Sequence, residues 1–102
     1  MILFDWDDAN REHIAEHDVS DVEAEEVISN DPIDLGRQND EGEERFLELG
    51  EARHGRILLV VSTMRGKKVR VVTAYDAPRK WRNYYLAHKV DFYGSETNRP
   101  EI

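Results

Sequence analysis

Residues 55–74 read GRILLVVSTMRGKKVRVVTA, and this stretch decides the fold. Its first half, residues 56–63, is apolar on both faces, which is typical of a central strand. Its second half, residues 67–74, alternates between two sets that are expected on opposite faces of a strand: Val69, Val71 and Thr73 on one, and Lys68, Arg70, Val72 and Ala74 on the other. Arg65-Gly66 supplies the turn between the halves, as His54-Gly55 does before them, so an antiparallel meander is predicted.

Weaker elements flank this stretch. Residues 45–49 alternate weakly and residues 33–37 are interpreted as a further strand, with an acidic turn or loop at residues 39–44 between them. On the other side, Pro78 suits the first turn of a last helix that reaches about residue 89. The polar end, residues 90–102, is assigned to a tail.

The N-terminal third predicts a short strand and two helices. Residues 2–6 are a short apolar run and are expected to form the strand. Asp7 or Asp8 then caps a helix through about residue 17, because a carboxylate there accepts hydrogen bonds from the free amides of the first turn. Ser20 and Glu23 form a capping-box pattern at the start of a second helix. The apolar stripe of that second helix is Ala24, Val27 and Ile28.

This order of elements predicts an α+β domain: a short strand, two helices, an antiparallel sheet of three to four strands and a final helix. The 102-residue length suits one domain, here residues 1–89. No apolar run approaches the roughly 20 residues that cross a bilayer. The start also lacks the pattern of a signal peptide. A cytoplasmic location without membrane contact is therefore expected.

The sequence gives little support for thiol chemistry or for a metal site. The chain has no cysteine, which excludes disulfides, thiolate catalysis and Cys-based zinc sites. His13 and His17 have the His-x-x-x-His spacing that can chelate zinc. The sequence shows no third ligand, so neither a metal nor another cofactor is expected. Such a helical face more often packs on a sheet with its polar atoms satisfied.

Charge is distributed unevenly along the chain. The formal net charge is −8, but residues 1–52 hold 18 acidic and 3 basic side chains, whereas residues 53–89 hold 10 basic and 1 acidic. One interpretation is a positive face on the C-terminal half that attracts phosphates or an acidic partner. The other is that acidic helices fold against basic strands and the field largely cancels. The sequence leaves both open.

Several motifs, taken in order, resemble the BrnT family. The opening FDWDDANREHIAEHDVS (residues 4–20) resembles its strand, Trp-Asp, Asn and His ahead of a His-Gly-Val turn. GEERFLELG (residues 42–50) resembles its Glu-x-Arg-Phe strand. Residues 55–85 resemble its Gly-Arg hairpin and the strand that leads into a basic helix ending in tyrosine. The resemblance covers about residues 2–86, and the order and spacing of the motifs make it specific.

The resemblance implies a RelE-like fold and the toxin of a type II toxin–antitoxin system. Such a toxin is a metal-independent endoribonuclease that cleaves RNA, inhibits translation and growth, and is neutralised by a BrnA-like antitoxin. The apolar tail residues Val90, Phe92 and Tyr93 suggest further contact area for a two-fold assembly with the antitoxin, unless they fold back on their own sheet. An alternative is a catalytically inactive binding module that pairs with an antitoxin-like, DNA-binding partner for transcription control.

Three positions depart from the family's pattern. Asp18 stands where the family usually has glycine, and this costs little because aspartate tolerates a left-handed turn. Tyr75 stands where the family usually has arginine, and Trp81 where it usually has glutamate. If those two family residues help cleavage, the activity of this chain is open, which is why the inactive alternative is retained.

Candidate catalytic residues follow from what metal-free RNA cleavage needs, namely a base, an acid and a cationic clamp on the phosphorane. Arg70, mid-strand among apolar neighbours, is the best candidate for the clamp; alternatively it pairs with a helix carboxylate. Arg45 and Arg56 start adjacent strands and are expected to converge on one edge, unless they are ordinary solvated strand ends. His17 is the candidate acid or base.

Candidate RNA-binding residues lie beside these. Lys68 is expected on the same face as Arg70. The last helix carries the others, Arg79, Lys80 and Arg82, and the first and last of them share a face because they are three residues apart. The alternative for the helix is a solvated basic face without a ligand.

Overall fold

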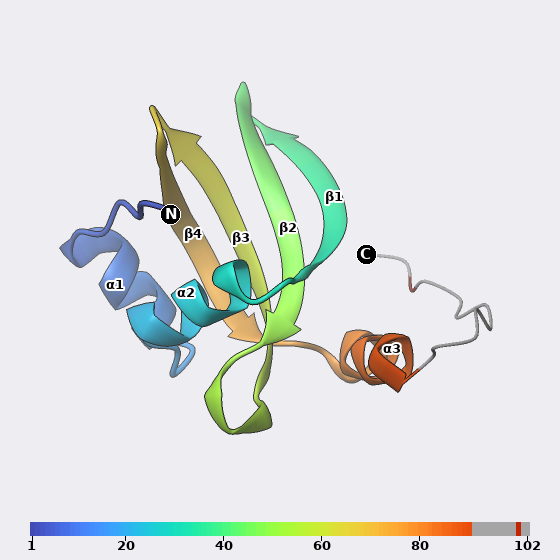
Figure 1. The fold of residues 1–102 in the computed structure, drawn as a ribbon. Coiled ribbons are helices and arrows are strands. Elements are labelled where there is room, and N and C mark those ends of the chain that lie inside the picture. Colours follow the sequence, from blue (N-terminus) through green and yellow to red (C-terminus); the bar gives the residue numbers. More distant parts are fainter. Residues whose placement is uncertain (91–99, 101–102) are drawn as a thin grey trace.

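A four-stranded antiparallel sheet with helices on both faces forms the body of the protein (Figure 1). The computed structural model describes residues 1–90 and residue 100. The sheet order follows the chain: β1 (Ile33–Asp40), β2 (Glu43–Glu51), β3 (Ile57–Arg65) and β4 (Lys68–Asp76). The helices are α1 (Asp8–Ala15), α2 (Asp21–Ser29) and α3 (Arg79–Val90), and a short 3₁₀ turn, η1 (Arg53–Gly55), joins β2 to β3. The predicted α+β class and element order are confirmed; most of the predicted tail lies outside the described residues.

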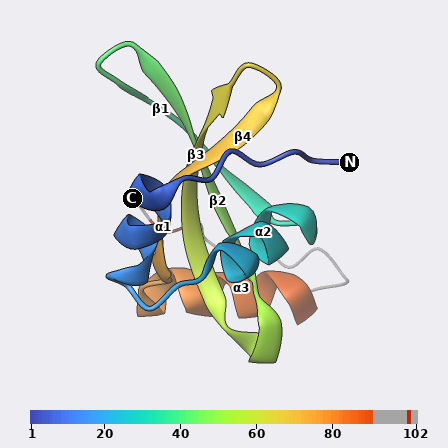
Figure 2. The ribbon, with the colours of Figure 1, turned by 90° about the vertical axis from the view of Figure 1, so that its left-hand side faces the viewer.

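The sheet separates two apolar cores. On one face, α1 and α2 bury the predicted stripe of Ala24, Val27 and Ile28 against Leu58 and Val60 of β3. On the other face, Trp81 and Tyr85 of α3 pack against a set of aliphatic side chains from all of the first three strands: Leu35, Leu47, Leu49, Ile57 and Leu59. Figure 2 shows α1 and α2 in front of the strands and α3 crossing behind them at their lower end. Strand β3 is apolar on both faces because it contributes to both cores.

The helix starts form as their sequences predict. Asp7 caps α1, and its carboxylate accepts a hydrogen bond from the Asn10 N–H while the Asn10 side chain accepts one from the Asp7 N–H. Ser20 and Glu23 form the expected reciprocal capping box of α2. Between the helices, Asp18 adopts a φ of 57°, the left-handed conformation for which the family uses glycine.

The N-terminal strand is shorter than expected. Instead of a strand over residues 2–6, the segment makes one parallel bridge, between Phe4 and Val69. Two backbone hydrogen bonds of 2.8 Å hold it, from the Asp5 N–H to the Val69 carbonyl and from the Val69 N–H to the Leu3 carbonyl. Because Asp7 already caps α1, the chain turns away from β4 after this single bridge.

A β-bulge changes which residues of β4 share a face. Val61 pairs with Thr73 and Ser62 with Val71, so Val72 has no partner across the ladder. An extra residue reverses the alternation beyond it. Val71 and Ala74 therefore both enter the core under α1 and α2, and the expectation that Ala74 shares a face with Arg70 was wrong.

The hairpin between β1 and β2 has a shorter turn than the sequence suggested. Strands β1 and β2 extend to Asp40 and from Glu43, so the expected acidic loop is the two-residue turn Glu41-Gly42. Both turn residues have positive φ, 52° and 84°, which is the geometry that two-residue hairpin turns favour.

Candidate functional site

Three arginines from three adjacent strands meet in one open depression. Arg45 of β2, Arg65 of β3 and Arg70 of β4 line it, together with His13 of α1 and the bulge residue Val72. The register explains the convergence: Thr63 pairs with Arg70 and Arg65 with Lys68, so these side chains of β3 and β4 share one face of the sheet. The depression encloses about 330 Å³. Two predicted catalytic residues, Arg45 and Arg70, are thereby brought together.

Each of these arginines is already paired with a carboxylate. Arg70 makes a two-pronged contact with Asp7, with Nη1–Oδ2 and Nη2–Oδ1 distances of 3.1 Å, and its Nη1 lies 3.6 Å from Asp5 Oδ2. Its side chain is only 17% exposed. The alternative in which Arg70 pairs with a helix carboxylate therefore describes the observed geometry, since Asp7 is the N-cap of α1.

The other two arginines share one partner. Arg65 Nη1 lies 2.6 Å from Glu43 Oε2, and Arg45 Nε lies 3.5 Å from Glu43 Oε1. Arg45 also contacts Asp40, with an Nη2–Oδ2 distance of 3.1 Å. Among the described residues, the buried Arg45 Nε has no hydrogen-bond acceptor. The contact to Glu43 is therefore electrostatic only.

These pairings stabilise the charged forms of the carboxylates. The hydrogen bond from Arg70 lowers the pKa of Asp7 below its ordinary value, and the hydrogen bond from Arg65 lowers the pKa of Glu43 in the same way. Asp7 and Glu43 therefore stay ionised at neutral pH and offset the positive charge of the depression. A phosphate that binds there must displace them or share the guanidinium groups with them.

A row of rings leads away from the depression. The His13 and His17 ring centroids are 6.0 Å apart with planes at 78°, and the His17 and Tyr75 centroids are 5.9 Å apart with planes at 53°. His13 and His17 are exposed and Tyr75 is half-buried. His17, a predicted catalytic residue, does not line the depression; His13, one ring closer, does.

Arg56 lies elsewhere and has a structural role. Strands β2 and β3 are antiparallel, with Phe46 opposite Ser62 and Glu51 opposite Ile57, so the starts of the two strands lie at opposite ends. The expectation that Arg45 and Arg56 converge was therefore wrong.

Five hydrogen bonds hold the Arg56 guanidinium at the far end of the sheet: two to the Asp76 carboxylate, one to Glu23, and one each to the carbonyls of Asp18 and His17. The bonds to Asp76 contribute most to raising the pKa of Arg56 above its ordinary value. Arg56 therefore ties β3 and β4 to the α1–α2 connection, and none of its contacts involves a residue of the depression.

The predicted RNA-binding residues remain on the surface. Lys68 of β4 and Arg79, Lys80 and Arg82 of α3 are all exposed. Within the described part of the chain, Arg79 and Arg82 take part in no ion pair of 4 Å or less. They are therefore cations that an anionic ligand can reach without displacing a carboxylate seen here.

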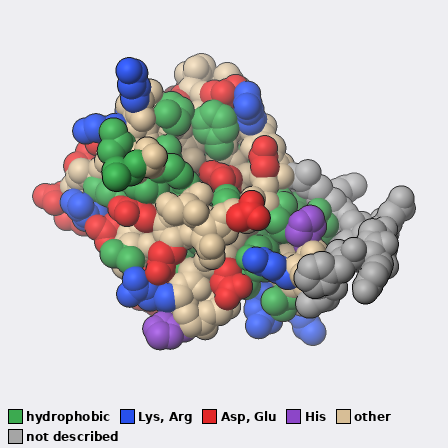
Figure 3. Space-filling model, viewed as in Figure 1, with side chains coloured by type: hydrophobic (Ala, Val, Ile, Leu, Met, Phe, Trp, Pro, Cys, Tyr) green, Lys and Arg blue, Asp and Glu red, His purple; other side chains and the backbone are tan. Residues whose placement is uncertain are grey.

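Elsewhere charges of both signs are mixed. On the face that carries α2, Lys, Arg, Asp and Glu side chains alternate over the surface (Figure 3). Arg53 pairs with Glu26 of α2, and Arg11 of α1 pairs with Asp21. The described strand arginines therefore fit the second interpretation of the charge distribution, in which acidic segments largely cancel the field of basic ones. Arg79 and Arg82 of α3 are the exception.

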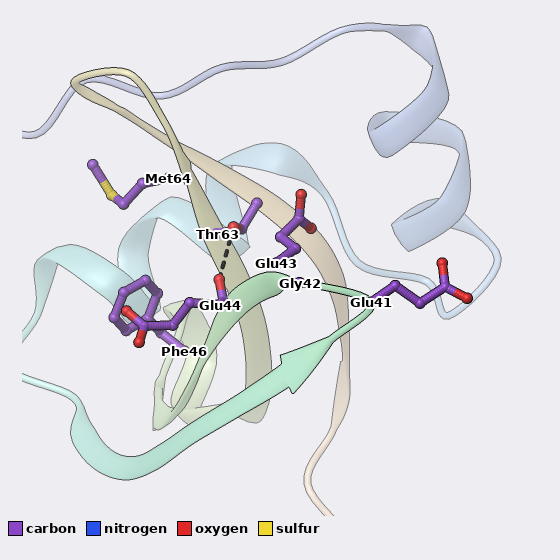
Figure 4. Close-up of a pocket in the computed structure, with 7 residues that line it drawn as sticks. All are labelled: Glu41, Gly42, Glu43, Glu44, Phe46, Thr63 and Met64. Carbon is purple, nitrogen blue, oxygen red and sulfur yellow. Dashed lines mark hydrogen bonds between the residues drawn. The ribbon is translucent and has the colours of Figure 1, made fainter.

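A second hollow, of about 420 Å³, is acidic and has no cationic lining. Its walls are Glu41, Gly42, Glu43, Glu44, Phe46, Thr63 and Met64. Figure 4 shows the Thr63 hydroxyl directed at the Glu44 backbone carbonyl, to which it donates a 2.8 Å hydrogen bond, while the Glu41 side chain points away from the rest. Glutamates at this hollow repel phosphate, so it is not a candidate nucleic-acid site.

Two observations bear on other kinds of site. In the part of the chain that the structure describes, no three His, Cys, Asp or Glu side chains come together as a metal site. No described helix is long and apolar enough to cross a membrane.

Sequence reasoning missed Arg65 and, as a site residue, His13. From the sequence alone, Arg65 is interpreted only as part of a turn. Because β3 continues to Arg65, Arg65 and Thr63 are two residues apart in one strand and lie on the same face of the sheet. Trp81, where the family usually has glutamate, is 2% exposed inside the α3 core. That position therefore supplies packing in this chain and no group for the depression.

Comparison with known proteins agrees with the fold and its motifs. The family model described as "Ribonuclease toxin, BrnT, of type II toxin-antitoxin system" matches residues 6–81. A crystal structure of the Brucella abortus ribonuclease toxin BrnT is similar in fold, with a TM-score of 0.57 and 22% identity over 78% of this chain and 100% of that one. No curated protein matches the sequence. Because the family model covers most of the chain, the protein belongs to the BrnT family of type II toxin–antitoxin ribonuclease toxins.

Proposed function

We propose that this chain is a metal-independent endoribonuclease that cleaves RNA at the arginine depression. The observation that carries the proposal is the convergence of Arg45, Arg65 and Arg70 from three strands, beside His13, on one open surface. Guanidinium groups fixed on strands are suited to stabilising the charge of a phosphorane, because they need little rearrangement as that charge develops. An imidazole beside them can take or give the proton.

The proposed roles follow from the contacts. Arg70 acts as the clamp, since Asp7 and Asp5 hold its guanidinium in place. Arg45 and Arg65 bind the neighbouring phosphate oxygens. His13 lines the depression directly and His17 touches its ring, so the two imidazoles are the candidate base and acid for the 2′-hydroxyl and the leaving oxygen.

The experiment is induced expression in a bacterial host, together with an RNA-cleavage assay on the purified chain. Arg70→Ala is expected to abolish growth arrest and to lower the cleavage rate by about 100-fold or more. Arg37→Ala is the matched control, because Arg37 is an exposed strand arginine that contacts Phe46 and Glu44 and does not line the depression. Equal cleavage by wild type and Arg70→Ala would refute the assignment.

The proposed partner is a BrnA-like antitoxin that covers the basic surface. Arg79 and Arg82 are exposed on one side of α3, so an antitoxin segment rich in Asp and Glu is the complementary ligand. Copurification with the product of the adjacent small gene tests this. The double variant Arg79→Glu/Arg82→Glu is expected to weaken the complex while leaving the circular dichroism spectrum intact; an undiminished complex would place the interface elsewhere.

A second candidate function, an inactive module that only pairs with an antitoxin-like partner, is favoured by a specific observation. Every arginine of the depression is already paired with a carboxylate, and Tyr75 and Trp81 replace the arginine and glutamate that the family usually carries. A wild-type chain that copurifies with its partner but neither cleaves RNA nor arrests growth would establish this function instead.

A further inference from the structure

The row of rings formed by His13, His17 and Tyr75 continues the surface of the depression. His13 belongs to both, because it lines the depression and contacts the His17 ring. From there His17 leads to Tyr75, which lies on β4 five residues beyond Arg70. Both views of the fold place α1 alongside the outer edge of β4 (Figures 1 and 2). The rings therefore run beside the strand that carries the proposed clamp.

The faces of these rings remain accessible. Neither contact is a parallel stack, since the planes meet at 78° and 53°, so no ring covers the whole face of its neighbour. His13 and His17 are exposed, and Tyr75 is half-buried and packs against the α3 core. A flat ligand can lie on such rings, and the adjacent arginines can hold an anion attached to it.

We propose that this aromatic row stacks the bases of single-stranded RNA whose phosphates lie at the arginine depression. The proposal rests on the proposed function and deepens it by assigning the residues that hold the bases of the RNA. Bases in a duplex are stacked on each other and cannot lie on protein rings, whereas splayed bases stack readily on Tyr and His. Stacking of this kind tolerates any base, because every base has a π-face.

Tyr75 carries the most weight in this proposal. It has the largest ring of the three, and this ring contacts that of His17, with centroids 5.9 Å apart. In the described part of the chain its hydroxyl takes part in no hydrogen bond, which leaves the ring as the part of the side chain that can hold a ligand. The competing explanation is that the rings only fill the junction of α1 and β4.

The test uses two fluorescein-labelled hexanucleotides and fluorescence anisotropy with the purified full-length chain. One is 2′-O-methyl RNA, which cannot be cleaved because the attacking hydroxyl is blocked; the other has the same backbone with abasic central positions. The wild type is expected to prefer the probe with bases by about 5- to 100-fold, the range typical of stacking on one or two rings. Tyr75→Ala should lower that preference severalfold, with the two imidazoles keeping part of it, and Tyr75→Phe should keep it unchanged.

Other variants separate this proposal from its neighbours. Arg70→Ala should weaken both probes by the same factor, because it removes a phosphate contact and no stacking surface. Urea unfolding of Tyr75→Ala shows how much of any change is structural; only a shift in the ratio between the two probes reports on stacking. A preference for bases that persists in a chain without cleavage activity would leave this proposal standing and refute the proposed function.

Several results would overturn the proposal. They are equal affinity of the wild type for the two probes, absence of binding to either probe, and an unchanged preference in Tyr75→Ala. If Tyr75→Ala spares RNA binding but weakens copurification of the antitoxin, the row is part of the protein interface and the RNA assignment is wrong.

Discussion

Replacing Asn10 with alanine is expected to lower the free energy of unfolding by about 2–4 kcal/mol. Asn10 is 4% exposed, and its side chain makes three hydrogen bonds. Its Oδ1 accepts from the Asp7 N–H at 2.8 Å, and its Nδ2 donates to the carbonyls of Asp5 at 3.0 Å and Val71 at 3.2 Å. The residue therefore joins the N-terminal segment, the cap of α1 and the bulged part of β4.

The magnitude follows from these three bonds. Each contributes about 0.5–1.5 kcal/mol net, and a buried acceptor left without a donor costs about 1–3 kcal/mol. The Val71 carbonyl is in that position, because its bond to Asn10 is buried. For a domain of this size the loss corresponds to a melting temperature lower by roughly 10–30 °C.

Urea unfolding followed by far-ultraviolet circular dichroism measures the effect. Asn83→Ala is the matched control: Asn83 is exposed on α3, and its replacement is expected to change stability by less than about 0.5 kcal/mol. A loss below about 1 kcal/mol in Asn10→Ala would show that water replaces these bonds.

Three further predictions concern charge and metal. Arg56→Ala should destabilise the fold at neutral pH. The hydrogen bond from Arg56 lowers the pKa of Asp76, so the stability that this pair contributes is present above the ordinary Asp pKa of about 3.9 and is lost as the pH falls below it. The urea unfolding curves of wild type and variant should therefore approach each other in acid. Asp7→Asn keeps a capping oxygen and removes one of the two carboxylates beside Arg70, so binding of single-stranded RNA should tighten by up to about fivefold; anisotropy titrations that show unchanged or weaker binding would contradict this. Cleavage should persist in excess EDTA, and activity that chelation removes and zinc or magnesium restores would disprove metal independence.

Local signals predicted the elements well because their causes lie within a few residues. The capping pair Ser20 and Glu23 satisfies amides of its own first turn, and the stripe of Ala24, Val27 and Ile28 needs only helical periodicity to share a face. The apolar run of β3 required a central position, since both of its faces had to be covered.

The candidate site was harder to predict because it depends on register. The bulge at Val72 reverses which residues of β4 point to each face of the sheet. No single residue type in the sequence predicts its position. The antiparallel pairing of β2 and β3 sends Arg56 to the end opposite Arg45, a consequence that holds for any antiparallel pair and was available from the predicted meander. Arg65 joined the site only because β3 continues to the turn itself.

Two groups among the described cations suit different tasks. Arg45, Arg65 and Arg70 are held by carboxylates on the sheet, whereas Arg79 and Arg82 are exposed on α3 and pair with no described carboxylate. Salt-dependent affinity for RNA comes from cations whose small counterions are released by phosphate.

At Arg70 a phosphate must instead compete with Asp7, whose carboxylate already contacts the two terminal nitrogens, Nη1 and Nη2, of the guanidinium. We therefore expect α3 to supply most of the affinity for an RNA or for an acidic antitoxin segment, and the strand arginines to supply geometry at the reacting phosphate. An antitoxin that binds α3 alone would then hold the toxin without blocking the chemistry. If RNA is cleaved at the depression as proposed, we expect a neutralising antitoxin to cover the depression as well as α3.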